Sequence, residues 1–176
     1  MSAMEVGSTV VRAATEADMA EIARIYGHYV LHTCSTFETE APSREEMAKR
    51  RAGILELGLP YLAAENEGRV VGYAYANAFR PRAAYRFTVE DSIYLDPEAV
   101  GRGYGQKLLE ALIEQCGQGP WRQMIAVIGD SRNTASVGLH KRFGFREVGT
   151  LTSVGFKLGQ WVDTVLMQRA LGAAAR

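Results

Sequence analysis

Apolar residues follow two different spacings along this chain. In several short stretches they alternate with polar residues, which is typical of a strand with one buried face. In other stretches they recur every three or four positions, which is typical of an amphipathic helix. Residues 124–128 are apolar throughout, which predicts a strand buried on both faces. The predicted strands are residues 9–12, 61–65, 70–76, 88–95, 124–128, 148–154 and 162–167.

The helical spacing predicts four helices. Thr15 is a favourable N-cap for the first, and Ser43 with Glu46 forms a capping box for the second. Strands and helices that alternate in this way predict an α/β fold with a mixed sheet. We expect one domain over residues 1–176, with a core at about 10–168 and short flexible termini. The predicted helices run from Thr15 to about His32, from Ser43 to about Leu57, from a glycine-rich turn to Cys116, and from Asn133 to Gly144.

Composition narrows the classes of partner. Lysine and arginine together number 20, as do aspartate and glutamate, so no basic surface for nucleic acid or for a membrane is indicated. The apolar runs are too short to span a membrane, and residues 1–20 lack the apolar core of a signal peptide. We therefore expect a cytoplasmic protein with a small-molecule partner. No cluster of residues has the spacing of a metal site.

Three glycines stand between a strand that ends at Asp96-Pro97 and the third predicted helix. Gly101, Gly103 and Gly105 would let the backbone approach a ligand without obstruction from side chains. The free N–H groups and the positive dipole of a helix N-terminus attract an anion such as a phosphate. A helix entered through a flexible turn is the alternative that these glycines alone leave open.

Two common phosphate loops do not fit this stretch. A nucleotide-binding P-loop requires serine or threonine after its lysine, but Leu108 follows Lys107. A dinucleotide fingerprint requires glycine at the position of Gln106.

Two loops carry residues suited to binding a substrate. The loop at residues 33–42 contains Phe37 and Glu40 and is a candidate lid; alternatively, Phe37 packs as an apolar plug and Glu40 is solvated. The loop after the third strand contains Arg80, Pro81 and Arg82. Arginine can bind a carboxylate or phosphate through two hydrogen bonds, although exposed arginines more often serve solubility.

The combination Gly101-x-Gly103-x-Gly105 with Asn133-x-x-Ser136-x-x-x-His140 resembles the GNAT superfamily of N-acetyltransferases. Within it the chain is similar to the phosphinothricin and methionine sulfoximine N-acetyltransferase group, through Phe37-x-x-Glu40-x-Pro42, residues 72–76, 85–90, 126–128 and 155–163. The resemblance covers about residues 10–168. The chain departs from the superfamily at Val100, where glutamine or arginine is usual, and at His140, where tyrosine is usual.

The resemblance implies a mixed, mostly antiparallel central sheet flanked by helices, acetyl-CoA as the co-substrate, no metal, and a homodimer. The acetyl-CoA site would comprise Ile93, Tyr94, Leu95, Gly101, Arg102, Gly103, Tyr104, Gly105, Gln106, Asn133 and Ser136. The substrate site would comprise Phe37, Glu40, Arg80, Pro81, Arg82, Tyr85, Glu90, Asp91 and Ser92.

Acetyl transfer requires a neutral amine, so a base must remove a proton from the ammonium form. Glu90 on the central strand is the candidate base, with an ion pair inside the sheet as its alternative role. His140 is the candidate that protonates the thiolate or donates a hydrogen bond to it, with helix packing as its alternative role.

The predicted function is acetyl-CoA-dependent N-acetylation of the α-amine of a small amino-acid-like substrate of the phosphinothricin, methionine sulfoximine or methionine sulfone type. Two alternatives stay open at this point. One is a GNAT enzyme for another amine, such as a peptide N-terminus, a polyamine or an antibiotic, and the other is a non-catalytic acyl-CoA-binding module.

Overall fold

The computed structural model describes residues 9–175. Seven strands form one sheet in the order β1-β2-β3-β4-β5-β7-β6, in which only β4 and β5 are parallel. The expected mixed, mostly antiparallel sheet is therefore confirmed. The strands are β1 (Val10–Ala13), β2 (Tyr61–Asn66), β3 (Arg69–Ala78), β4 (Thr88–Leu95), β5 (Gln123–Gly129), β6 (Arg146–Lys157) and β7 (Gln160–Ala170).

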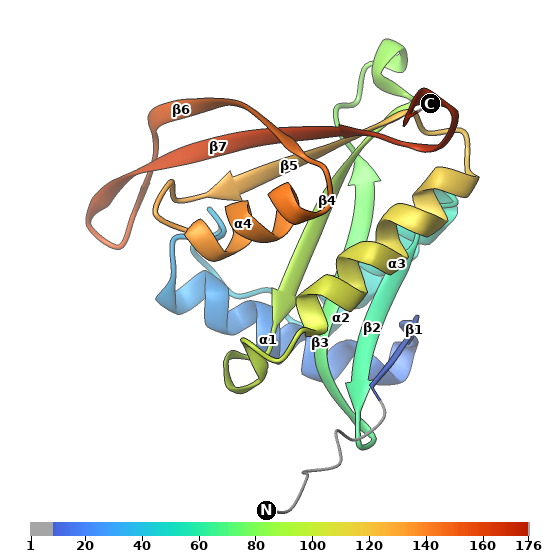
Figure 1. Ribbon diagram of the computed structural model, residues 1–176. Coiled ribbons are helices and arrows are strands. Elements are labelled where there is room, and N and C mark those ends of the chain that lie inside the picture. The colour runs from blue at the N-terminus through green and yellow to red at the C-terminus, as the bar shows by residue number, and fades with distance from the viewer. Residues whose placement is uncertain (1–8, 176) are drawn as a thin grey trace, which may run out of the picture.

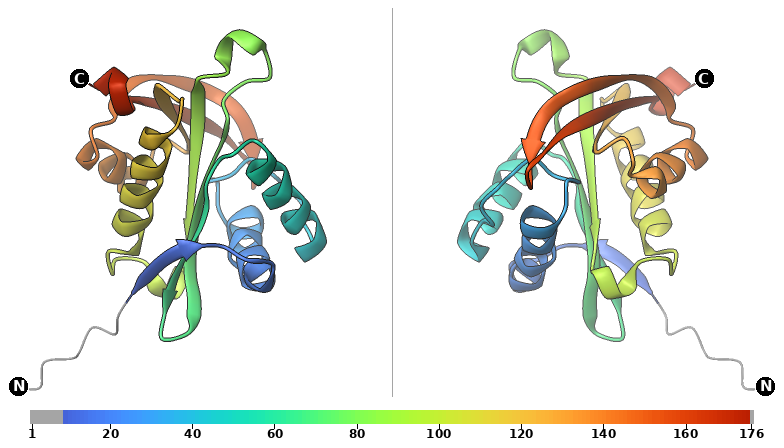
Figure 2. Two further views of the ribbon diagram at one scale, coloured as in Figure 1. Left: turned by 90° about the vertical axis from the view of Figure 1, so that its right-hand side faces the viewer. Right: turned by 90° about the vertical axis from the view of Figure 1, so that its left-hand side faces the viewer.

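Helices cover both faces of the sheet. Figures 1 and 2 show α1 and α2 on one face and α3 and α4 on the other. None of the helices within residues 9–175 is long and apolar enough to cross a lipid bilayer. The helices are α1 (Met19–His32), α2 (Arg44–Glu56), α3 (Tyr104–Gln118) and α4 (Thr134–Arg142).

Two predicted helix starts differ in detail from the structure. Thr15 caps a short 3-10 turn, in which its N–H donates to Asp18 Oδ2 at 2.7 Å, and α1 begins only at Met19. Ser43 Oγ accepts the N–H of Glu46 at 3.1 Å, as predicted. The Glu46 carboxylate instead accepts from Arg50 Nε at 2.9 Å, so only half of the predicted capping box forms. For the Glu46 carboxylate, a hydrogen bond to the charged side chain of Arg50, one turn later, is stronger than one to the backbone N–H of Ser43.

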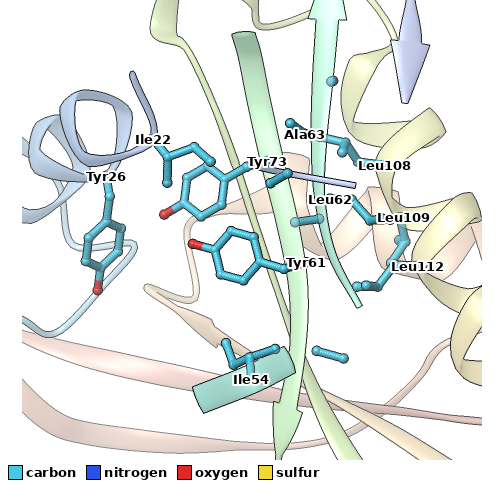
Figure 3. Packing of buried hydrophobic residues seen from close by; sticks show 14 of the residues in the cluster. Ile22, Tyr26, Ile54, Tyr61, Leu62, Ala63, Tyr73, Leu108, Leu109 and Leu112 are labelled. Carbon is cyan, nitrogen blue, oxygen red and sulfur yellow. The ribbon is translucent and has the colours of Figure 1, made fainter. Parts of the chain in front are cut away.

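The core lies on both sides of the sheet, as Figure 3 shows. Tyr61 and Tyr73 stack at 5.9 Å between ring centroids on the side of α1 and α2. Leu108, Leu109 and Leu112 of α3 are fully buried on the other side. Burial of each leucine contributes about 1.5–3 kcal/mol, so α3 is fixed firmly against the sheet.

Gly72 on β3 determines how closely α3 approaches. A Cβ at Gly72 would lie 2.5 Å from Leu95 Cδ2 and 3.3 Å from Leu108 Cδ1. Only glycine fits there without displacing the end of β4, which is where the predicted ligand loop begins.

A buried carboxylate fixes the end of β4. Asp96 is 2% exposed, and its side chain accepts from Arg24 at 2.5 Å and from Arg69 at 3.0 Å. Its second oxygen accepts the N–H of Glu98 at 3.0 Å. These contacts tie α1 and β3 to the turn that leads into the glycine-rich loop.

Strands β4 and β5 pair only where they begin. Their parallel register covers Thr88–Asp91 with Gln123–Ala126 and then stops. From there β4 continues beside β3 as far as Leu95, while β5 continues beside β7 as far as Gly129. The two strands therefore diverge, and a gap opens in the middle of the sheet.

Candidate functional site at the divergence of two strands

A cavity of about 480 Å³ lies at the divergence of β4 and β5. We call it the cleft. It is bordered by the second half of each strand, the glycine-rich loop, and α4. The residues that line it are Tyr29, Ser35, Asp91–Leu95, Val100, Gly101, Gly103, Gly105, Gln106, Ala126–Gly129, Asn133, Ala135, Ser136, Leu139 and His140.

The glycine-rich loop supplies an anion site at one end of the cleft. Gly101 and Gly103 have φ of 82° and 84°, in the left-handed region that favours glycine. The first backbone N–H of α3 that has a partner in the helical pattern is that of Lys107, which donates to Gly103 O at 3.3 Å. The preceding N–H groups of the helix have no intrahelical acceptor and carry the positive end of its dipole. A phosphate fits this geometry.

The free edge of β4 borders the middle of the cleft. Residues 93–95 have no partner on β5, because the parallel register ends at Asp91. Tyr29 donates its hydroxyl to Leu95 O at 2.7 Å, which holds the end of the strand against α1. An extended ligand that lies along this edge can therefore use backbone groups that a continuous sheet would occupy.

The opposite wall comes from the loop after β5 and from α4. Asn133 caps α4, since its Oδ1 accepts the N–H of Ser136 at 3.3 Å. His140 follows Ser136 by one turn of α4 and is buried. Its Nε2 lies 2.9 Å from Asp91 Oδ2. A wall of the cleft therefore contains a buried carboxylate–imidazole pair.

Glu90 projects from the other face of β4. Asp91 contacts His140 and so lies on the α4 face, and side chains alternate along a strand, so Glu90 lies on the opposite face, that of α1 and α2. Across the sheet Glu90 pairs with Asn77, two residues from Tyr75. Burial, followed by the nearby Asp91 carboxylate, raises the pKa of Glu90 to about 7. A carboxylate with that pKa is suited to accept a proton at neutral pH.

A second cavity, also of about 480 Å³, lies on this same face between α2 and β2–β3. Arg50 at its wall is held by Glu38 at 2.7 Å and by Glu46 at 2.9 Å. No residue of this cavity was predicted as a site residue, because its polar groups come from separate elements with no common sequence pattern. It is lined by Tyr26, Glu38, Met47, Arg50, Gly53, Ile54, Leu57, Tyr61, Tyr75 and Asn77.

Most of the predicted acetyl-CoA residues line the cleft, and two do not. Tyr104 is 6% exposed and packs in the apolar core, so it offers the cleft only its backbone. Arg102 is exposed, and its side chain does not border the cleft. Val127 lies in a strand that was predicted to be buried on both faces, but its side chain is 40% exposed because β4 no longer pairs with β5 at this position. Sequence reasoning missed Tyr29, Ser35, Val100, Ala126–Gly129, Ala135 and Leu139, whose approach depends on the divergence of the strands.

The predicted substrate residues are spread over separate places. Arg80 lies over the rings of Phe79 and Tyr85, with Cζ 5.0 Å and 5.8 Å from the ring centroids, in a loop that projects beyond the sheet (Figure 1). Phe37 contacts Gly155 of β6. Neither cavity is lined by Phe37, Glu40, Arg80, Pro81, Arg82 or Tyr85.

Asp91 borders the cleft, whereas Glu90 does not. It was expected to line a substrate pocket with Glu90, but strand alternation directs it toward His140 in the cleft. Ser92 borders the cleft as well, at the point where the strands separate.

Comparison with known proteins connects this geometry to one family. Residues 11–166 match the acetyltransferase (GNAT) domain family. The chain is 54% identical over 163 residues to the phosphinothricin N-acetyltransferase of Alcaligenes faecalis, covering 93% of this chain and 83% of the relative. It is 37% identical over 161 residues to the L-methionine sulfoximine/L-methionine sulfone acetyltransferase of Salmonella typhimurium, covering 92% and 94% of the two chains.

A solved structure shares both fold and sequence with this chain. It is a GNAT superfamily phosphinothricin acetyltransferase from Sinorhizobium meliloti in complex with AcCoA. The two chains are 48% identical, with a TM-score of 0.90, and the match covers 93% of this chain and 89% of the other.

The anion site can be tested at Gly103. In Gly103→Ala the added methyl group disfavours a φ of 84°, so the loop must shift and the affinity for coenzyme A should fall by about tenfold, or roughly 1.4 kcal/mol. Gly58→Ala is the matched control, since Gly58 has a φ of 72° at the end of α2, away from the cleft. Denaturation should show a similar loss of stability, about 1–2 kcal/mol, in both variants. Titration calorimetry that gives equal coenzyme A affinities for the two variants would contradict the assignment.

Proposed function

The chain belongs to the GNAT family of acetyltransferases and uses acetyl-CoA as the acetyl donor, and we propose that its acceptor is the α-amine of a small amino acid of the phosphinothricin, methionine sulfoximine or methionine sulfone type. Relatives named for these substrates support the choice. A thioester supplies an acetyl carbonyl that a neutral amine can attack.

The observation that carries the proposal is the position of Glu90. It pairs with Ile125 one residue before the register of β4 and β5 ends. Its side chain therefore lies beside the opening between the strands, on the face opposite to the α4 wall of the cleft. An acceptor on the α1 and α2 face would meet the base and the opening at the same point.

Each group acts at its own stage of the transfer. Glu90 accepts a proton from the acceptor ammonium, directly or through water, so that the nitrogen lone pair becomes available. Backbone N–H groups at the free edge of β4, in residues 93–95, stabilise the oxyanion that forms on the attacked carbonyl. The N–H groups at the start of α3 hold the pyrophosphate and fix the thioester in place.

Two exposed arginines favour an acceptor that carries a carboxylate over a polyamine. Arg80 and Arg82 lie in the loop that leads into β4, and neither forms an ion pair with an acidic residue within residues 9–175. The guanidinium groups of Arg80 and Arg82 can therefore bind the carboxylate or the phosphinate of a substrate. Such a substrate would draw this loop toward Glu90. Phe37, in the loop after α1, and Tyr85, in the loop before β4, supply exposed aromatic surface.

The proposal is tested by following thiol release from acetyl-CoA across a panel of amines. L-phosphinothricin, L-methionine sulfoximine and L-methionine sulfone should give saturable turnover, with product mass increased by one acetyl group. A peptide N-terminus and spermidine should give at least about a hundredfold lower kcat/KM, since they do not place a carboxylate beside the amine. Turnover with the peptide or with spermidine alone would refute the proposed acceptor, and silence with every amine would refute the activity.

The base assignment predicts a specific pH dependence. Glu90 works only when deprotonated, so kcat should fall as the pH drops below about 7 and level off above it. Glu90→Gln should lower kcat by on the order of 10²–10⁴ and remove this acidic limb, with coenzyme A affinity unchanged. Glu114→Gln, which changes an exposed carboxylate on α3, serves as the control and should keep the wild-type profile. A Glu90→Gln profile like that of the wild type would exclude Glu90 as the base.

We also propose that the enzyme is a homodimer formed through the β6–β7 hairpin. This hairpin extends beyond the end of β5 (Figure 1), and almost all of β6 is exposed. Large apolar side chains are normally not concentrated on one exposed surface of a monomer. Those exposed on the hairpin are Val148, Leu151, Val154, Phe156, Leu158 and Trp161.

A charge within this apolar surface should separate the subunits. Val154→Glu is expected to give a monomer by light scattering at micromolar concentration, because a carboxylate would have to be buried in the interface. Leu55→Glu is the control, since Leu55 is a similarly exposed apolar residue on α2. A wild-type mass equal to one chain would contradict the dimer.

A further inference from the structure

Asp91 and His140 form a buried pair in the wall of the cleft. Asp91 is 6% exposed and His140 is 4% exposed, yet both line the cleft. His140 Nδ1 lies 2.7 Å from the carbonyl oxygen of Ser136 in the preceding turn of α4. A carbonyl oxygen can only accept, so Nδ1 carries a hydrogen.

That hydrogen restricts what lies on the other ring nitrogen. Nε2 is 2.9 Å from Asp91 Oδ2, and two facing lone pairs would repel at this distance. One more proton must therefore lie between the imidazole and the carboxylate. The pair holds it as an imidazolium hydrogen-bonded to a carboxylate, with no net charge.

The second carboxylate oxygen is the feature that a purely structural pair does not explain. Asp91 Oδ1 is buried and has no hydrogen-bond partner among residues 9–175. Buried polar atoms are normally paired, so an unpaired one in the wall of a substrate cleft points to a partner that arrives during the reaction.

Two titratable side chains, those of His140 and Cys116, face Asp91. Hydrogen bonding and charge from Asp91 outweigh the effect of burial and raise the pKa of His140, which retains the shared proton. Burial, and then Asp91, raises the pKa of the Cys116 thiol on α3 to about 12, so this thiol stays protonated. Glu90, the neighbour of Asp91 on β4, projects from the opposite face.

We propose that Asp91 and His140 together are the acid of the reaction, and that Asp91 passes their shared proton to the departing thiolate. The proton moves from Nε2 to Asp91 Oδ2, and rotation of the carboxyl group about its Cβ–Cγ bond turns this O–H toward the sulfur. As the C–S bond breaks and the amide is completed, the sulfur takes this proton and forms the S–H bond. The second proton of the attacking nitrogen leaves to water through Glu90, which has already released the first. The pair then carries one negative charge until it takes up a proton from water. This inference rests on the proposed acetyl transfer, in which Glu90 collects the proton of the amine.

The protonation of the pair can be measured without turnover. In protein labelled with ¹⁵N-histidine, His28→Gln and His32→Gln assign the other two histidines. His140 should show two protonated ring nitrogens at pH 7.5, about one unit above the ordinary histidine pKa near 6.5. In Asp91→Asn the ring should be protonated only at Nδ1. A bare Nε2 in the wild type would overturn the proposal, and this measurement needs no variant of Asp91.

Kinetics test the role of the shared proton. In wild type kcat should fall at alkaline pH as the pair loses its proton, whereas Asp91→Asn should lower kcat by about tenfold or more and lack this alkaline limb. Coenzyme A affinity should stay within about twofold. Cys116→Ala, a buried change beside the pair, is the control and should retain the limb.

The outcomes separate this inference from the proposed function. Active Asp91→Asn with an unchanged alkaline limb would refute the role of the pair and leave the acetyltransferase intact. Failure of every amine in the wild type would refute both, even if the nitrogen spectra show the shared proton.

Discussion

The divergence of β4 and β5 is the constraint on which the rest of the site depends. A parallel pair that continued past Asp91 would occupy the backbone edge at residues 93–95 with hydrogen bonds to β5. The separation leaves that edge free of a strand partner, beside the cleft. Past Asp91, each strand pairs within the sheet only with its outer neighbour, β4 with β3 and β5 with β7.

Local contacts keep the two strands apart. Gly129 at the end of β5 lies against the loop after α1, where a Cβ would come within 2.6 Å of Cys34 O and 2.9 Å of Ser35 O. On the other side, Tyr29 and the ion pairs of Asp96 hold the end of β4. Helix α1 contacts the end of β4 and the loop after it contacts the end of β5, so a change in this segment would alter the width of the cleft.

The sequence predicted the elements well because their signals are local. The glycine-rich loop, the cap at Asn133 and the strand at residues 88–95 each depend on residues close together in the chain. The length of β6 and β7 was underestimated, since much of the hairpin is paired only with itself and lacks the alternating burial of a covered strand.

The site was predicted less completely because it depends on contacts across the sheet. In the sequence, nothing but the alternation of the strand separates the environment of Asp91 from that of Glu90. The contact of Asp91 with His140 joins residues 49 positions apart. The spacing of apolar and polar residues along the sequence does not predict such a contact. The same holds for the second cavity, which collects residues from α1, α2, β2 and β3 as well as Glu38 from the loop between the first two helices.

The absence of the usual polar residue at position 100 also has a structural explanation. Val100 is 57% exposed and borders the cleft, but it offers no donor beyond its backbone. Gly101 and Gly103 turn the chain so that the start of α3 faces the same space, and the ion-paired Asp96 fixes where that turn begins. The N–H groups at the start of α3 thus provide positive potential at this end of the cleft without a charged side chain at position 100.

Successive residues of β4 divide the proton chemistry between the two faces of one strand. Glu90 and Asp91 are neighbours in sequence, and the two carboxylates would repel strongly if both were charged and unpaired in the same pocket. Strand alternation separates them, and His140 neutralises Asp91. In the proposed reaction, Glu90 accepts a proton on the acceptor side while the pair retains one on the thiol side. A shift of one residue in the register of β4 would exchange these faces, so the pairing with β3 is as much a part of the chemistry as the carboxylates themselves.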